Sequence, residues 1–303
     1  MKIRERILPV LLALLLLAGS VPVALAAEEP AETSPTPAAT SEPAEASPTP
    51  AATSEPTEAS PTPTATNEPA DASPTPAANT LARAGGTIPE GLSHIDDGES
   101  VTITGYTGSA SSLEIPAAIN GKPVTAIGEA AFTYCSSLTS IKIPASVTSI
   151  GMNAFGNCEN LTSIDIPASV INIGNGAFMD CSRLTSIEIP AGITKIEQNT
   201  FYGCSSLTSI EIPANVTTII DSAFWECTGL HSVTFEEGSQ LAGIEKNTFY
   251  GCSNLTSISI PNSVASIGNS AFTNCTALRS VTFEEGSKLT AIEKDTFYNC
   301  KSL

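Results

Sequence analysis

Basic residues and histidine are scarce in this sequence. Its 303 residues include 13 Lys and Arg against 31 Asp and Glu, and only two His, which gives a formal net charge of −18. Nucleic-acid phosphates are bound mainly by Lys and Arg, so the charge balance argues against a nucleic-acid partner. It also argues against charge-driven binding to anionic lipid. The simplest consequence of the acid excess is solubility.

The scarcity of histidine bears on catalysis. His94 lies in an N-terminal segment, and His231 takes a repeat position that Thr holds elsewhere. A general base must first lie within reach of a substrate, and the sequence pattern implies no pocket around either imidazole. We therefore predict no catalytic residue, no metal ligand and no cofactor, and interpret the chain as something other than an enzyme.

Long apolar runs are also few. The apolar stretch from Ile7 to Ala18 is too short to span a bilayer, and it follows a basic start. Ala24-Leu25-Ala26 is a small-x-small cleavage site. We predict a signal peptide over residues 1–26, a mature chain that begins at Ala27, and no transmembrane segment after cleavage. The alternative is an uncleaved membrane anchor. The predicted localisation is secreted or cell surface.

Residues 27–86 hold almost no large apolar side chain. A 13-residue repeat rich in Pro, Thr, Ser and Ala starts at Ser34, Ser47 and Ser60, and a partial copy starts at Ser73. Such a tract buries too little apolar surface to offset chain entropy, and its prolines favour an extended chain. We predict a disordered low-complexity stalk. Ser and Thr beside Pro suit O-glycosylation, and a passive unmodified linker is the alternative.

After the stalk, one apolar signature recurs at a fixed period. A Phe returns every 23 or 25 residues, a Cys follows it by three residues, and a Leu follows the Cys by three more. A period of this length is typical of a solenoid, in which each repeat contacts only its neighbours. We predict repeats over residues 132–303, preceded by an N-terminal cap and an irregular first coil over residues 87–131. The recurring phenylalanines are Phe132, Phe155, Phe178, Phe201, Phe224, Phe249, Phe272 and Phe297.

Each repeat also carries two strand signals. In one repeat, Ile164-x-Ile166 alternates like a strand and Pro167 ends it, and residues 170–173 suggest a second short strand. Stacked coils bury the apolar positions through a parallel ladder with a spacing of about 4.8 Å. The fold class is thus mainly β. The predicted core of this region consists of Phe155, Cys158, Leu161, Ile164, Ile166, Phe178 and Cys181.

The eight cysteines all hold the same repeat position, from Cys135 to Cys300. They should form one inward column whose parallel side chains give poor disulfide geometry. No His lies near the column to complete a metal site. We predict buried free thiols that pack as small hydrophobic groups.

The repeat resembles the BspA-like, or Treponema-type, class of leucine-rich-repeat surface proteins. The resemblance rests on the pattern Leu-Thr-Ser-Ile-x-Ile-Pro-x-x-Val-x-x-Ile-Gly-x-x-Ala-Phe-x-x-Cys, as in Leu138 to Cys158, and covers about residues 99–303. It implies a right-handed solenoid with a parallel sheet on one face. It also implies a cell-surface or secreted role, often in adhesion to host matrix or to other microbes. The class has no catalytic residues to carry over.

Two surfaces are candidates for binding. Tyr202, Trp225 and Tyr250 follow the Phe in successive coils, so they either form an aromatic row for a glycan or protein or simply cover neighbouring coils. On the strand face, Asp165, Glu188 and Glu211 form an acidic column that either docks a basic protein segment or is solvated β surface.

The two longer repeats add the pairs Glu236-Glu237 and Glu284-Glu285. These pairs suggest either a cation-binding edge or a solvated turn. No fixed oxygen cage is encoded around them, which favours the turn.

From these patterns we predict a secreted or cell-surface adhesion or recognition protein that binds a host or microbial protein or glycan. The last repeat stops at Leu303, before its strand, so we expect the natural product to continue. Two alternatives follow: a targeting arm of a larger secreted enzyme whose catalytic domain lies beyond residue 303, and a structural component of a surface coat.

Overall fold

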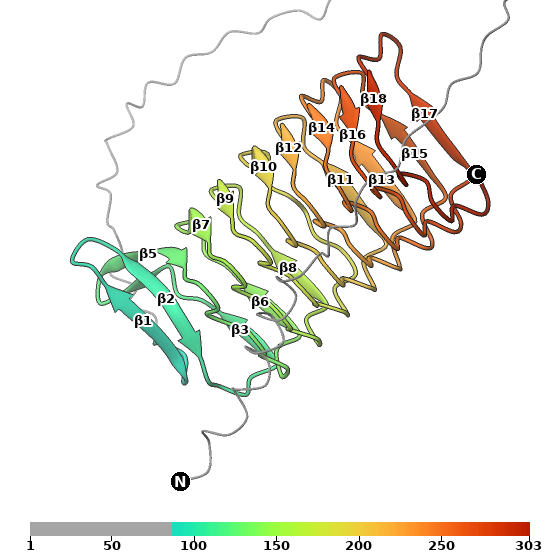
Figure 1. Ribbon diagram of the computed structural model, residues 1–303. Helices are drawn as coiled ribbons and strands as arrows, with labels where there is room; N and C mark the ends of the chain where they lie inside the picture. Colours follow the sequence, from blue (N-terminus) through green and yellow to red (C-terminus); the bar gives the residue numbers. More distant parts are fainter. Residues whose placement is uncertain (1–86) are drawn as a thin grey trace, which may run out of the picture. The chain divides into compact units, whose positions relative to one another are not determined.

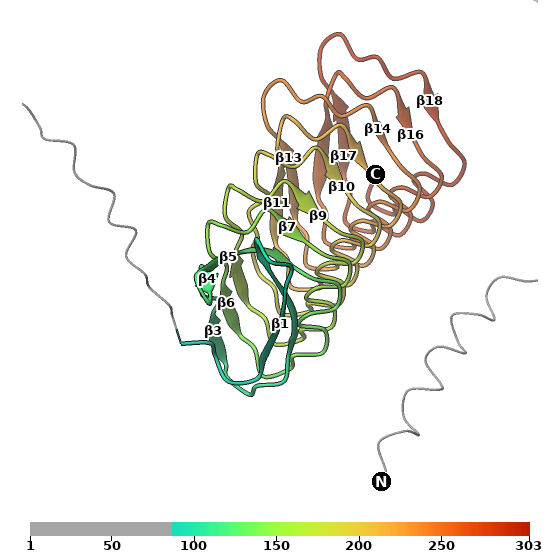
Figure 2. The same ribbon diagram turned by 90° about the vertical axis from the view of Figure 1, so that its left-hand side faces the viewer.

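The computed structural model of the protein describes residues 87–303. The predicted signal peptide (1–26) and stalk (27–86) lie outside the described residues. Residues 87–303 form a mainly β solenoid whose coils stack along parallel ladders (Figures 1 and 2), as predicted. Within this part of the chain, no helix has the length and apolar character that crossing a membrane would require.

The first coils differ from the rest. β1 (Leu92–Asp96) and β2 (Val101–Tyr106) form an antiparallel hairpin, and β2 pairs in parallel with β5 (Lys122–Ile127). The short β4 (Ala118–Ile119) folds back onto β5. The hairpin covers the end of the stack, where a regular repeat would leave its apolar side and ladder exposed.

The regular coils contribute strands to two ladders, one on either side of the coil, except that the coil carrying β10 has no strand on the first side. The first ladder forms the strand face, and its side chains alternate between the interior and solvent. Its strands are β3 (Ser112–Glu114), β6 (Ser140–Lys142), β8 (Ser163–Asp165), β11 (Ser209–Ile212), β13 (Ser232–Phe235), β15 (Ser257–Ile260) and β17 (Ser280–Phe283).

The second ladder consists of β5 followed by two-residue strands. They are β7 (Ser149–Ile150), β9 (Asn172–Ile173), β10 (Lys195–Ile196), β12 (Thr218–Ile219), β14 (Gly243–Ile244), β16 (Ser266–Ile267) and β18 (Ala291–Ile292).

The register places equivalent residues of neighbouring repeats side by side. Ser140 pairs with Ser163, and Ile210 pairs with Val233, so each repeat position becomes a column. The second strand is shorter than predicted: it consists of Asn172–Ile173, and residues 170–171 lie between the turn and the strand. The repeat also predicts a strand at residues 186–188, and none forms there.

The core is built from columns of identical side chains. Neighbouring Phe rings stack with centroids 5.2 to 5.7 Å apart and planes within 15°. Stacking on both sides keeps these rings out of water and gives the aromatic contacts extra stabilisation. All seven residues named above for the core are buried: Phe155, Cys158, Leu161, Ile164, Ile166, Phe178 and Cys181.

The cysteine column lies beside the Phe column. All eight thiols are free; six are buried, and Cys135 and Cys300 are half-buried. Each buried thiol also makes a contact that the sequence did not suggest. Cys204 donates to the carbonyl oxygen of Phe178 at 3.2 Å, and Cys227 donates to that of Phe201 at 3.1 Å. The thiols therefore tie each coil to its neighbour as well as filling space.

Candidate binding surfaces

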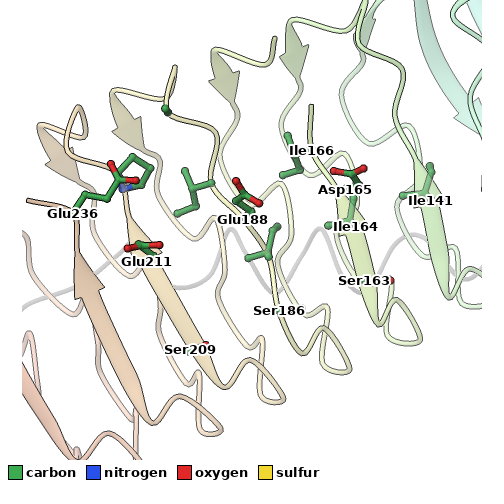
Figure 3. A pocket seen from close by; sticks show the side chains of 14 residues that line it. Ile141, Ser163, Ile164, Asp165, Ile166, Ser186, Glu188, Ser209, Glu211 and Glu236 are labelled. Atoms are coloured by element: carbon green, nitrogen blue, oxygen red, sulfur yellow. The ribbon is translucent and has the colours of Figure 1, made fainter. Parts of the chain in front are cut away.

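A groove opens on the strand face where its ladder is interrupted. The three-stranded sheet ends at β8, the four-stranded sheet begins at β11, and Ser186–Ile189 between them form no backbone hydrogen bond to either neighbour. The groove has a volume of about 630 Å³ and spans several coils (Figure 3). Ile166 and Ile189 form part of the apolar floor of the groove, and both are buried.

Four carboxylates from successive coils line this groove. Asp165 comes from β8, Glu188 from the interrupted segment, Glu211 from β11, and Glu236 follows β13 directly (Figure 3). No Lys or Arg lines it, and all four acidic side chains are exposed. The predicted strand-face column thus lies along one groove, and Glu236 joins it.

The groove carboxylates lack basic partners. None of the four forms an ion pair with any residue of the 87–303 region. Lys142, on the neighbouring β6, is bound to Glu114 at 2.7 Å. That hydrogen bond is the main cause of the raised pKa of Lys142, and the charge of Asp165 adds a smaller effect. Lys142, the residue paired with Asp165 in the ladder, is therefore already bound to another acid.

Like charges in adjacent strands repel one another, and the repulsion is largest at low salt. A cationic ligand relieves it. The apolar floor beneath the acids adds a place for the methylene stems of Lys or Arg, which pack on apolar surface while their heads stay solvated. The arrangement therefore fits a positively charged, extended segment.

Glu236 has a second role that the sequence did not indicate. Its Oε2 accepts a hydrogen bond from the Ala214 amide at 2.9 Å, and Glu284 accepts one from Asn262 at 3.0 Å. In both longer repeats the first Glu of the pair thus accepts a hydrogen bond from a backbone amide of the preceding coil. The sequence feature that could have indicated this role is the recurrence of Glu at the same position of both longer repeats. Among the described residues, no group of three or more His, Cys, Asp or Glu is arranged to hold a metal ion.

The two histidines lie apart from this groove. His94 is in the β1 strand of the cap. His231 is exposed, and its Nδ1 lies 2.6 Å from the carbonyl oxygen of Gly229. No carboxylate is hydrogen-bonded to either ring within residues 87–303.

The aromatic row forms a stack. The centroids of Tyr202 and Trp225 are 6.0 Å apart with an interplanar angle of 15°, and those of Trp225 and Tyr250 are 4.0 Å apart at 14°. All three residues are half-buried. Burial raises the pKa of the Tyr202 hydroxyl, and the nearby charges of Glu226 and Asp180 add to the rise. The Trp225 ring is covered by its two neighbours, which leaves mainly its edge for contact with a ligand.

This geometry favours the covering role of the row. We expect Trp225→Ala to lower the free energy of unfolding by about 1–3 kcal/mol, because it removes two stacked pairs. Thermal unfolding measures the loss, and Trp225→Phe, which keeps a stacked ring, should recover most of it. Unchanged stability together with lost ligand binding would instead make the row a binding site.

Comparisons with known proteins agree with the observed architecture. The family described as BspA type Leucine rich repeat region matches residues 125–254 and 242–303, with six copies. A leucine-rich repeat protein of Treponema pallidum is 25% identical, with a TM-score of 0.53 over 72% of this chain and 90% of that one. A leucine-rich cell surface protein from Faecalibacterium prausnitzii is 26% identical, with a TM-score of 0.39 over 72% and 93%. No curated protein matches the chain.

Proposed function

Since this chain belongs to the family of BspA-type leucine-rich repeat proteins, we propose that it is a non-enzymatic adhesion or recognition protein, secreted or held at a cell surface. It binds a partner protein through the strand face. The observation that carries this proposal is the groove with its four carboxylates and no basic lining residue. The partner that fits is a host or microbial protein with an exposed segment rich in Lys and Arg.

Charge complementarity explains how such a surface selects a partner. Opposite charges steer the encounter and reject acidic or neutral segments, and both effects weaken as salt is added. The repeated spacing of the acids matches an extended segment better than a compact one. A glycan is the weaker candidate, because the ring faces that would stack on sugars are largely occupied by one another.

The proposal is tested by titrating a short Lys-rich peptide into the protein at low ionic strength. Asp165→Asn, Glu188→Gln and Glu211→Gln together should weaken binding about tenfold, because exposed ion pairs contribute roughly 0.2–1 kcal/mol each. A matched control, Glu99→Gln, Glu129→Gln and Glu159→Gln, removes the same charge at exposed sites that do not line the groove. Binding that weakens equally in both triple variants, or that is absent from the wild type, would contradict the proposal.

A further inference from the structure

Both ladders of the solenoid stop after the same coil, but the second ladder resumes in the next coil at β10 and the strand face resumes one coil later at β11. β8 and β9 are the last strands of their sheets, and β10 and β11 begin new ones. We call this boundary the seam; it separates the coil that carries β8 and β9 from the coil that carries Ser186–Ile189 and β10. The labels β8 and β9 on one side and β10 on the other mark the seam in Figure 1.

Specific hydrogen bonds are missing at the seam. At the boundary before it, the Ile171 amide donates to the Thr148 carbonyl at 3.0 Å, and at the boundary after it the Thr217 amide donates to that of Thr194 at 2.9 Å. The equivalent amide at the seam belongs to Thr194, and it makes no bond to the preceding coil. The Glu197 amide also makes no bond to the preceding coil. One repeat later, the equivalent Ile220 amide donates to the Ile196 carbonyl at 2.9 Å.

Two residues on the edge of the coil account for the gap. Ile171 stands where Thr or Ala stands in other repeats, and its side chain is 64% exposed. Gly192 takes the repeat position that Ser169 holds in the preceding coil and Asn215 in the following coil. The Ser169 hydroxyl donates to the Val147 carbonyl at 2.7 Å, and the Asn215 amide donates to the Ala191 carbonyl at 3.1 Å. A Cβ on Gly192 would lie 3.0 Å from the Cγ2 atom of Ile171. The seam therefore lacks the side-chain hydrogen bond that joins coils at this position at the boundaries before and after it, and the branched Ile171 side chain lies close to Gly192 across it.

The opposite edge of the same coils stays closed. Phe178 stacks on Phe155 at 5.5 Å and on Phe201 at 5.7 Å. The Cys181 thiol donates to the Phe155 carbonyl at 3.2 Å, and the Gly176 amide donates to that of Gln198 at 2.9 Å. The Phe and Cys columns are therefore continuous, while the ladders are not.

We propose that the solenoid consists of two stacks of coils, residues 87–173 and 186–303, joined by a hinge at the edge where the Phe and Cys columns cross the seam. Opening at the hinge separates Asp165, on the first stack, from Glu188 and Glu211, on the second. The spacing of the groove carboxylates is thus adjustable. In a solenoid, stability depends on nearest-neighbour interfaces, so a weakened interface divides the chain into two cooperative units.

The only tryptophan of the chain, Trp225, lies in the second stack and reports on its unfolding. Far-UV circular dichroism reports on both stacks. In urea, we expect the two signals to give different transition midpoints for the wild type, since coincident transitions are the mark of one cooperative unit. In the variant Ile171→Ala with Gly192→Ser, which restores residues used at intact boundaries, the midpoints should coincide. Coincident midpoints in the wild type would overturn the hinge.

Amide exchange on the native protein provides a test that needs no variant. The amides of Ser186–Ile189, Thr194 and Glu197 should exchange at least about a hundredfold faster than those of Thr217 and Ile220, because only the latter are bonded within a ladder. Equal exchange rates for the amides at the seam and for those of Thr217 and Ile220 would overturn the hinge. Thr148→Ile with Ser169→Gly transplants the Ile–Gly pair to the preceding boundary, and should speed exchange of Ile171. Neither experiment involves a ligand, so the outcome is independent of the groove's role in binding.

Discussion

Phe224→Ala is expected to lower the free energy of unfolding by about 3–5 kcal/mol, the range for removing a fully buried aromatic ring. The Phe224 ring is fully buried and stacks on Phe201 at 5.2 Å and on Phe249 at 5.3 Å. Its loss leaves a cavity that touches two coil interfaces, and solenoid stability resides in such interfaces. Urea unfolding followed by far-UV circular dichroism measures the effect.

The control for this prediction is an exposed ring in the same fold. Tyr298 is 66% exposed, so Tyr298→Ala should change stability by no more than about 0.5 kcal/mol. A loss below about 1 kcal/mol for Phe224→Ala would mean that the Phe column does not organise the core. A comparable loss for Tyr298→Ala would mean that exposure in this structure does not predict energetic contribution.

Stability is expected to fall steeply above pH 9 because of the cysteine column. Burial, with a smaller effect from the Cys135 thiol, raises the pKa of Cys158 from 9.0 to about 12. Burial is also the main cause that raises the pKa of Cys181, Cys204 and Cys227 well above the ordinary value. Above pH 9 the unfolded chain loses these protons and the folded chain keeps them. The stabilisation is therefore complete below pH 9 and decreases as pH rises toward 12, by about 1.4 kcal/mol per thiol and pH unit.

Cys227→Ala isolates the contribution of one thiol. The two proteins differ in no other side chain, so the difference between the two slopes belongs to Cys227. Urea unfolding at several pH values between 9 and 10 should give a slope that is shallower by about 1 kcal/mol per pH unit in the variant, because the unfolded thiol is only partly ionised at pH 9. Identical slopes would show that the Cys227 thiol is not buried as a neutral group.

The core and the columns could be predicted from the sequence because burial repeats with the period. The spacing from Phe155 to Phe178 and from Cys158 to Cys181 fixes which side chains face inward in every coil. Stacking then follows from the parallel register, so the alignment of Asp165, Glu188 and Glu211 on one face was also predictable. These features depend only on positions within the repeat.

The interruption of the strand face could not be predicted in this way. Residues 184–190 and 207–213 have the same sequence, Leu-Thr-Ser-Ile-Glu-Ile-Pro, yet only the second segment forms a strand, β11. The cause therefore lies outside the segment, and we assign it to Ile171 and Gly192, where two coils meet. A contact between repeats is invisible to a pattern that describes each repeat separately. The same reason explains why the hydrogen bond from the Ala214 amide to Glu236 was missed.

Amide exchange with and without the Lys-rich peptide locates the binding surface most directly. If the groove binds the basic segment, exchange should slow at Ser163–Asp165, Ser186–Ile189 and Ser209–Ile212, and these changes should vanish in the Asp165, Glu188 and Glu211 triple variant. Slowed exchange around Tyr202 and Trp225, with none on the strand face, would contradict the assignment of binding to the groove.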